Sequence, residues 1–274
     1  MLTVVAGTGY TGRRVLARLS VDEALGLGRT SIETDRRFSQ VDFDSAEALG
    51  VTLPDRFAVL YTCPPDGASD QRLARFLPAL PHPPERFVYI STTGVYGDCR
   101  GAVVTEDSPV KPDNRLSSPR VDAETRLADW SQETGCQLVI LRVPGIYGPG
   151  RLGLERIRAG DAFLREPDAS PGNRIHVDDL VECCLAALRE HTPAGIYNVG
   201  DGDHRSATWF ADEVARQAGI PAPRKITRAE AAQEFSPMRL AFLASSRIVD
   251  TTRMRTILGV TPRTPEEGIK ASLP

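Results

Sequence analysis

The chain has 274 residues, of which 41% are hydrophobic, enough to bury the core of one large α/β domain or of a domain with a smaller second lobe. Its formal net charge of -3 comes from interspersed charges, which excludes the basic surface expected of a protein that binds nucleic acid. No apolar run approaches the roughly 18 residues of a membrane span, so we expect no membrane partner.

The five cysteines are odd in number and lack paired Cys-x-x-Cys spacing; they are Cys63, Cys99, Cys136, Cys183 and Cys184. This distribution supports neither a disulfide framework nor a metal site. The opening Met-Leu-Thr-Val-Val-Ala has too few apolar residues for a signal peptide. We therefore expect a cytoplasmic protein without a bound metal.

Strand-like and helix-like segments alternate through the first half of the chain. Short apolar runs typical of buried parallel strands lie at 2–6, 56–63, 86–92 and 137–143, with a weaker run at 23–28. Helical patterns lie between these runs, at 13–19, 71–80 and 123–134. The alternation predicts an α/β fold, a doubly wound parallel Rossmann sheet with right-handed crossovers.

The pattern becomes less regular after residue 150. The predicted elements there are a turn at 169–174, a helix at 178–189, a strand at 195–200 and a helix at 207–219. We expect a Rossmann domain at 1–150, to which 174–200 returns, and a smaller substrate-binding lobe formed by 151–173 and 201–274. Such a lobe would lie over the carboxyl edge of the sheet, where ligands bind in open α/β folds.

A glycine-rich turn links the first strand to the first helix and reads Gly7-Thr8-Gly9-Tyr10-Thr11-Gly12. Its G-x-G-x-x-G pattern in this context predicts a nicotinamide dinucleotide whose pyrophosphate lies on the turn. Gly7 permits the tight turn, Gly9 lets the backbone approach the ligand, and Gly12 allows close helix packing. The alternative is a glycine turn without a ligand.

The end of the second strand decides which dinucleotide binds, because an acidic residue there would hold the ribose 2′-hydroxyl and a cation would accept a 2′-phosphate. Arg29 follows Gly28 at this point, with Arg36 or Arg37 as a helper, and favours NADP over the alternative NAD. Arg29 could equally be a solvated surface residue. Asp42 is a candidate contact to the adenine or a loop cap.

A second signal comes from RFVYISTTGVYGD at 86–98, where a buried strand ends in Ser-Thr-Thr and leads to Val-Tyr-Gly. This segment resembles the extended short-chain dehydrogenase/reductases, the NAD-dependent epimerase/dehydratase proteins. Similar segments follow in the order of that family: LRVPGIYGPG at 141–150, RIHVDDL at 174–180, YNVGDG at 197–202 and ILGVTPRTPEEGI at 257–269.

The resemblance implies an active site made of a Ser or Thr hydroxyl, a Tyr-x-x-x-Lys pair and the cofactor. Thr92 takes the hydroxyl position, unless it only satisfies a nearby backbone group. Alignment through Glu124 places Leu116 where the tyrosine should be and Arg120 where the lysine should be. Leucine cannot transfer a proton, and an arginine side chain is a fixed cation that can still bind ribose or phosphate.

No Tyr-x-x-x-Lys pair exists elsewhere in the sequence. The residues four positions before Lys111, Lys225 and Lys270 are Asp107, Pro221 and Glu266. The chain therefore resembles atypical members of the extended group, which keep the cofactor site and lack the usual catalytic pair.

Two tyrosines have an arginine four residues later, Tyr96 with Arg100 and Tyr147 with Arg151. Each pair lies in a glycine-rich turn, where this spacing does not align side chains on one helical face, so Tyr96 is a weak acid/base candidate.

In RIHVDDL, His176 could titrate with Asp179 as its orienting partner. The resemblance favours instead a structural turn in which the aspartates cap the following helix.

The resemblance also assigns ligand contacts. Pro144 and Gly145 would shape the backbone near the nicotinamide, Thr62 would line the cofactor crevice, and Tyr147 would wall the substrate cleft. Arg174 and Arg247 lie in segments that contact nucleotide sugars in relatives, and either could meet a diphosphate.

Two functions follow from these expectations. The first is an NADP-dependent oxidoreductase or epimerase acting on a nucleotide-sugar-like or other small hydroxy or keto substrate. The second is a non-catalytic NADP-binding sensor or regulatory protein, favoured by the missing catalytic pair. A homodimer is a further expectation of the resemblance.

Overall fold

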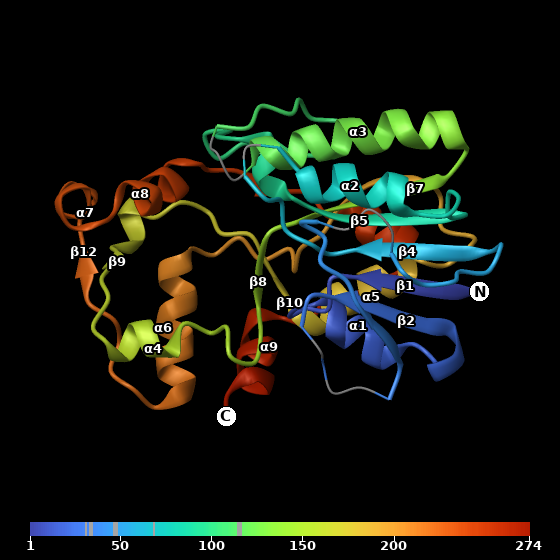
Figure 1. Ribbon diagram of the computed structural model, residues 1–274. Coiled ribbons are helices and arrows are strands. Elements are labelled where there is room, and N and C mark those ends of the chain that lie inside the picture. The colour runs from blue at the N-terminus through green and yellow to red at the C-terminus, as the bar shows by residue number, and fades with distance from the viewer. Residues whose placement is uncertain (31, 33–34, 46–48, 68, 114–116) are drawn as a thin grey trace.

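The computed structural model describes residues 1–30, 32, 35–45, 49–67, 69–113 and 117–274 (Figure 1). Its centre is a sheet of seven parallel strands in the order β11-β7-β5-β4-β1-β2-β3. The strands are β1 (Leu2–Ala6), β2 (Ala24–Gly28), β3 (Arg37–Gln40), β4 (Phe57–Tyr61), β5 (Arg86–Thr92), β7 (Gln137–Val143) and β11 (Gly195–Asn198). Because the order reverses at β1, a crevice is expected beyond the carboxyl ends of β1 and β4.

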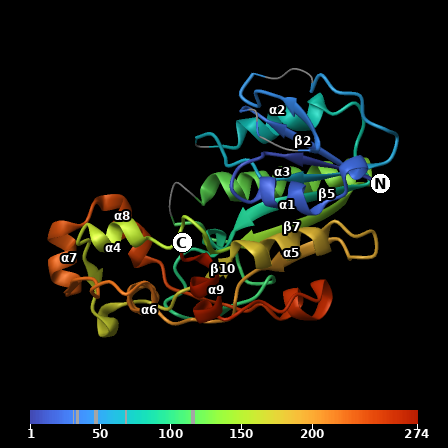
Figure 2. The same cartoon turned by 90° about the horizontal axis from the view of Figure 1, so that it is seen from below.

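Helices cover both faces of this sheet, as Figures 1 and 2 show. One face carries α1 (Gly12–Arg18) and α5 (Val177–Ala187), and the other carries α2 (Gln71–Ala79) and α3 (Ser118–Thr134). Neighbouring residues of one strand therefore enter different apolar clusters, Val5 on the α5 side and Val4 on the α2 side. Burial on both faces explains why the strands are continuous apolar runs.

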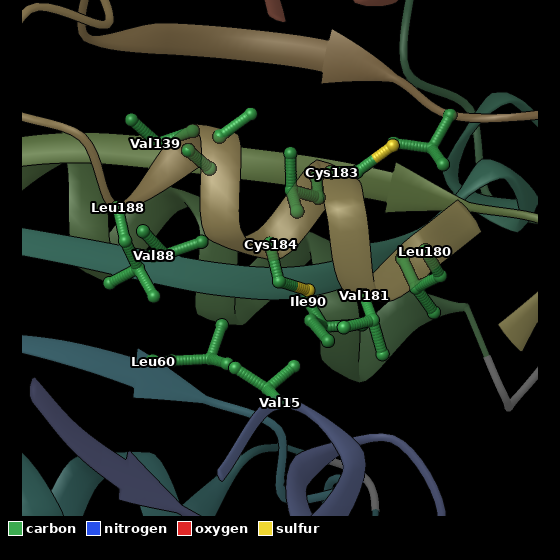
Figure 3. Packing of buried hydrophobic residues seen from close by; sticks show 14 of the residues in the cluster. Val15, Leu60, Val88, Ile90, Val139, Leu180, Val181, Cys183, Cys184 and Leu188 are labelled. Carbon is green, nitrogen blue, oxygen red and sulfur yellow. The ribbon is translucent and has the colours of Figure 1, made fainter. Parts of the chain in front are cut away.

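Figure 3 shows the α5 side of the core, where Val181 and Cys184 lie beside Ile90 of β5 and Leu60 lies beside Val15 of α1. All five cysteines are free thiols, and only Cys99 is partly exposed.

The lobe beside the carboxyl edge contains short helices and pairs of short parallel strands (Figure 2). Its helices are α4 (Leu154–Arg158), α6 (Ala207–Ala218), α7 (Arg228–Glu234), α8 (Pro237–Ala244) and α9 (Pro265–Ser272). The strand pairs are β8 (Gly145–Tyr147) with β10 (Arg174–His176), β9 (Phe163–Leu164) with β12 (Lys225–Ile226), and β6 (Val103–Val104) with β13 (Ile248–Val249). Within the described ranges, no helix has the length and apolarity needed to cross a membrane.

Single turns complete the described chain: η1 (Val21–Glu23), η2 (Thr93–Tyr96), η3 (Glu166–Asp168) and η4 (Met254–Leu258). The predicted strands at 2–6, 86–92 and 137–143 agree with the observed limits to the residue. Helix α3 begins at Ser118, five residues earlier than predicted, because Pro119 is well suited to a first helical turn.

A buried ion pair joins the elements that reach the crevice. Arg142 of β7 donates to Glu124 of α3 over 2.7 Å, and the two side chains are 3% and 9% exposed. Ser91 of β5 donates to the same carboxylate at 2.5 Å. Arg142 also donates to the Tyr96 hydroxyl at 2.9 Å, and that hydroxyl donates to Asn198 of β11 at 2.7 Å. The network fixes α3 and three strand ends relative to one another.

We expect Glu124→Ala to lower the free energy of unfolding by about 3–5 kcal/mol, because the buried Arg142 guanidinium loses its carboxylate partner. Urea unfolding of the purified variant measures this loss. The matched control is Asp161→Ala, which breaks an exposed ion pair with Arg156 and should cost no more than about 1 kcal/mol. Equal losses in the two variants would contradict the role given to the buried pair.

Candidate functional site

The turn after β1 is held in place from both neighbouring strands. Gly7 N donates to Leu27 O of β2 at 2.9 Å. On the other side, Thr62 N donates to Ala6 O at 2.8 Å, and Thr62 Oγ1 donates to Gly7 O at 2.6 Å. Thr62, a predicted cofactor residue, thus lies directly after β4, where it fixes the glycine turn.

The three glycines of the turn meet different constraints. Gly7 has φ +100°, and a Cβ there would lie 2.6 Å from Thr62 Oγ1; a Cβ on Gly12 would lie 1.9 Å from Gly7 O. The chain itself therefore requires glycine at both positions. A Cβ on Gly9 would meet no atom of the described chain within 4 Å. The exposed backbone at Gly9 is thus open to a ligand, and the turn fits the pyrophosphate of a dinucleotide.

Tyr10 connects the turn to the segment after β8. Its ring lies between the guanidinium groups of Arg14 and Arg151, at 4.0 and 3.9 Å from the ring centre. Its hydroxyl donates to Pro149 O at 2.9 Å, and partial burial raises the pKa of that hydroxyl. Arg151 therefore stacks on Tyr10, and two cations flank the turn. Thr11, the residue before α1, is buried.

The last residue of β2, Gly28, has no side chain. A Cβ on Gly28 would lie 2.3 Å from Thr8 Oγ1, so Thr8 of the turn packs directly against this strand. Arg29 follows, 58% exposed, with Nη1 3.2 Å from Asp44. Arg36 does not join it, because its Nε and Nη2 donate to Leu19 O beyond α1. Our expectation of Arg36 as a helper was wrong.

Asp42 adopts the geometry of a loop cap. Its two carboxylate oxygens accept from Asp44 N at 3.1 Å and Ser45 Oγ at 2.9 Å. The adenine contact stays a prediction.

Thr92 and Arg120 lie at the end of β5. Thr92 Oγ1 accepts from Gly94 N at 3.1 Å. Arg120 Nη1 donates to Ile90 O at 2.6 Å and to the Tyr89 hydroxyl at 3.1 Å, so its guanidinium is anchored on the strand that carries Thr92. Leu116, which stands at the expected tyrosine position, lies outside the described residues.

Several predicted site residues are occupied by structural contacts. Tyr96 is 1% exposed and its hydroxyl belongs to the Arg142 network, while burial raises its pKa. Tyr147 is also buried, with its ring 5.3 Å from His176 and 5.1 Å from Phe210. Tyr147 is therefore part of the lobe's core and does not present the expected cleft wall.

The two candidate substrate arginines differ in their environments. Arg174 is buried and donates to Asp203 at 3.3 Å and to Ser206 O at 3.2 Å. Arg247 donates from Nη1 to Gly97 O at 2.8 Å, but its buried Nε has no hydrogen-bond partner among the described residues. Arg247 thus keeps a donor for a ligand, whereas Arg174 is held by the chain. Pro144 and Gly145 link β7 to β8, and Gly145 is exposed.

Comparison with known proteins finds a family that matches part of the chain. A model described as the NAD dependent epimerase/dehydratase family matches residues 69–200. This part of the chain is therefore similar to the NAD-dependent epimerase/dehydratase family.

Two proteins resemble the chain over different lengths. Protein YeeZ of Escherichia coli K12 is 33% identical over 184 residues, which cover 65% of this chain and 62% of YeeZ. Human dTDP-D-glucose 4,6-dehydratase is 28% identical over 138 residues, 47% of this chain and 39% of the human protein. The chain thus spans about three fifths, or less, of the length of these relatives.

A solved structure of a functionally unknown conserved protein from Silicibacter pomeroyi DSS superposes with a TM-score of 0.80 at 26% identity. The alignment covers 99% of this chain and 98% of that one. The Rossmann sheet with its carboxyl-edge lobe is therefore an architecture that the two chains share over nearly their whole length.

The RIHVDDL segment has a structural role in this chain. His176 is the residue that caps α5, because its Nδ1 accepts from Asp178 N at 3.2 Å, and its Nε2 pairs with Ser272 Oγ at 2.9 Å. Burial lowers the pKa of His176 and favours the neutral ring. Asp179 accepts from Arg263 N and Nε at 3.1 and 3.0 Å. The aspartates are therefore not the caps that we expected.

Sequence reasoning missed Asp201, which follows Gly200 in YNVGDG. Its Oδ1 accepts from Asp203 N at 2.9 Å, whereas its buried Oδ2 has no partner within the described part of the chain. Burial raises the pKa of this carboxyl to about 7. Only the fold reveals this, because the sequence around Asp201 reads as an ordinary turn.

We expect Gly9→Ala and Gly12→Ala to separate binding from folding. Gly12→Ala should lower the free energy of unfolding by at least about 2 kcal/mol, because its Cβ clashes with Gly7 O. Gly9→Ala should change it by less than about 0.5 kcal/mol and weaken dinucleotide binding more than about tenfold. Urea unfolding and calorimetric titration measure the two effects; unchanged binding in Gly9→Ala would contradict the site.

Proposed function

We propose that this protein binds NADP in the crevice beyond β1 and β4 and acts on a nucleotide-sugar-like substrate. The observation that carries the NADP preference is the end of β2. Gly28 offers no carboxylate for a ribose 2′-hydroxyl, and Thr8 fills the space where a side chain would start. The exposed Arg29 follows directly and can accept a 2′-phosphate. NAD, the cofactor in the family's description, is the alternative.

The chain's own residues suit a dinucleotide that runs along the carboxyl edge. Gly9 exposes backbone for the pyrophosphate, and Tyr10 places two guanidinium groups beside it. Thr92 lies at the other end, as the last residue of β5, and Gly145 begins β8, just after β7. When bound there, the nicotinamide supplies hydride transfer.

Thr92 and Arg120 are the residues that we assign to the reaction. Because Thr92 Oγ1 accepts from Gly94 N, its own proton can be donated to a substrate oxygen. Arg120, anchored on Ile90 O, supplies a fixed positive charge near that oxygen and no proton. A substrate group or water then moves the proton that a tyrosine moves in the standard pair.

A nucleotide-sugar-like substrate is supported by the relative named dTDP-D-glucose 4,6-dehydratase and by Arg247, whose buried Nε can face a phosphate. The second candidate function is a non-catalytic NADP sensor, favoured by the absence of Tyr-x-x-x-Lys from the sequence. A homodimer and a cytoplasmic location stay predictions.

Calorimetric titration with NADPH and NADH tests the cofactor. We expect NADPH to bind about tenfold more tightly, because only it carries the phosphate for Arg29. Arg29→Gln should remove this difference, whereas Arg156→Gln, which alters a comparably exposed arginine in the lobe, should keep it. Tighter binding of NADH to the natural protein would contradict the proposal.

Measurement of turnover distinguishes the two proposed functions, an NADP-dependent enzyme and a non-catalytic NADP sensor. Incubation with NADP and a panel of nucleotide sugars, followed by the absorbance of reduced nicotinamide and chromatography of the sugars, detects the reaction. We expect Thr92→Ala to lower kcat by about 100-fold with little change in NADPH affinity. Equal turnover in Thr92→Ala would remove Thr92 from the reaction, and no turnover with any sugar in the natural protein would favour the sensor.

A further inference from the structure

Three charged side chains meet at the end of the crevice nearest β2 and β3. Asp44, in the loop after β3, lies between Arg29, after β2, and Arg72, on α2. Sequence reasoning singled out only Arg29 of these three. The ion pairs place a carboxylate at the guanidinium group to which we assign the adenosine 2′-phosphate.

The two arginines are held very differently. The Arg72 side chain is 14% exposed and donates hydrogen bonds to both carboxylate oxygens of Asp44. Its Nε donates to Oδ1, and its Nη2 donates to Oδ2 at 3.0 Å. Its Nη1 donates to Pro64 O at 3.1 Å, which fixes the guanidinium on the loop after β4. The hydrogen bonds from Arg72 to Asp44 hold the pKa of the Asp44 carboxyl below its usual range, so that this carboxyl stays anionic at neutral pH.

Arg29 makes a single contact with Asp44, at 3.2 Å, and is 58% exposed. Its backbone is fixed, since Gln40 Nε2 donates to Arg29 O at 2.9 Å. Its side chain can therefore turn away from Asp44 while the main chain stays in place. Asp44 then keeps Arg72 as its partner, so the departure of Arg29 leaves no uncompensated charge.

We propose that Asp44 is a stand-in anion for the 2′-phosphate. In the free protein Asp44 holds Arg29, and when NADP binds, the 2′-phosphate replaces Asp44 as the partner of Arg29. Asp44 thereby tunes the choice between NADP and NAD. This inference rests on the NADP site proposed above. A single exposed ion pair is weak, whereas a phosphate carries up to about two negative charges and three acceptor oxygens. The phosphate therefore replaces Asp44 as the partner of Arg29. This exchange breaks the Arg29–Asp44 ion pair and leaves the phosphate repelled by the nearby Asp44 carboxylate.

The competing reading is that Asp44 accepts a hydrogen bond from the ribose 2′-hydroxyl, as an acidic residue does in NAD sites. The two readings predict opposite effects of removing its charge. If Asp44 is a stand-in anion, its carboxylate weakens the binding of NADPH. If Asp44 is a ribose ligand, its carboxylate strengthens the binding of NADH.

The test is calorimetric titration of the natural protein, Asp44→Asn, Arg29→Gln and the double variant. NADPH and NADH are the whole ligands, and 2′,5′-ADP and 5′-AMP isolate the phosphate. We expect Asp44→Asn to tighten NADPH and 2′,5′-ADP about five- to tenfold and to change NADH and 5′-AMP less than about twofold. In the Arg29→Gln background, the same substitution should tighten NADPH less than about twofold.

Asp161→Asn is the matched control, because it breaks an ion pair of similar exposure, 55% and 36%, in the lobe; it should leave all four affinities unchanged. Thermal unfolding checks that each variant is folded.

The outcomes separate the two proposals. If Asp44→Asn leaves NADPH affinity unchanged, or tightens it equally without Arg29, the stand-in role is wrong while the NADP site stands. If Asp44→Asn selectively weakens NADH, Asp44 is a ribose ligand and the inference is overturned. If the natural protein binds neither cofactor, the proposed function fails first and the inference falls with it.

Discussion

The buried ion pair between Glu124 and Arg142 is the interaction on which the crevice depends. It joins α3 to β7, takes in Ser91 of β5, and reaches Asn198 of β11 through the Tyr96 hydroxyl. These elements end at the carboxyl edge of the sheet. Thr92 follows Ser91 directly, and Arg120 precedes Glu124 by one helical turn on α3. The reaction residues that we propose are thus positioned by a network that lies beneath them.

Arginine does much of the structural work around this edge. Arg120 is anchored on Ile90 O and Arg72 on Pro64 O. A guanidinium group can hold a backbone carbonyl and a carboxylate together because it has five donors in a rigid plane. An arginine beside the crevice is therefore not by itself a ligand contact. Arg29 makes a single side-chain contact with Asp44, and the Arg247 Nε has no partner among the described residues, so we propose both as ligand contacts.

Much of the fold could be predicted from the sequence because its strands are buried on both faces. The runs at 2–6, 86–92 and 137–143 are continuous and apolar, and their limits are sharp. The two-residue strands β6, β9, β12 and β13 could not be predicted, since a pair of residues carries no periodicity and each depends on a partner distant in the chain.

The glycine turn was the predictable part of the site, because its spacing directly reflects backbone constraints that Gly7 and Gly12 now display. Burial set by tertiary packing was not predictable. Tyr147 lies against Phe210, and Arg174 against Asp203, because α6 and its preceding loop fold back on β8 and β10. The charge pairing of Asp44 was equally hidden, since its two partners are distant in the chain: Arg29 follows β2 and Arg72 lies on α2.

We propose above that a dinucleotide lies along the carboxyl edge from Arg29 to Thr92. Hydrogen–deuterium exchange of backbone amides with and without saturating NADPH tests it most directly, since it reads the whole chain without a variant. With NADPH bound there, we expect slower exchange at 7–12, 29–30 and 92–97, with the lobe segment 207–218 unchanged. Unchanged exchange in the glycine turn, or protection confined to the lobe, would contradict it.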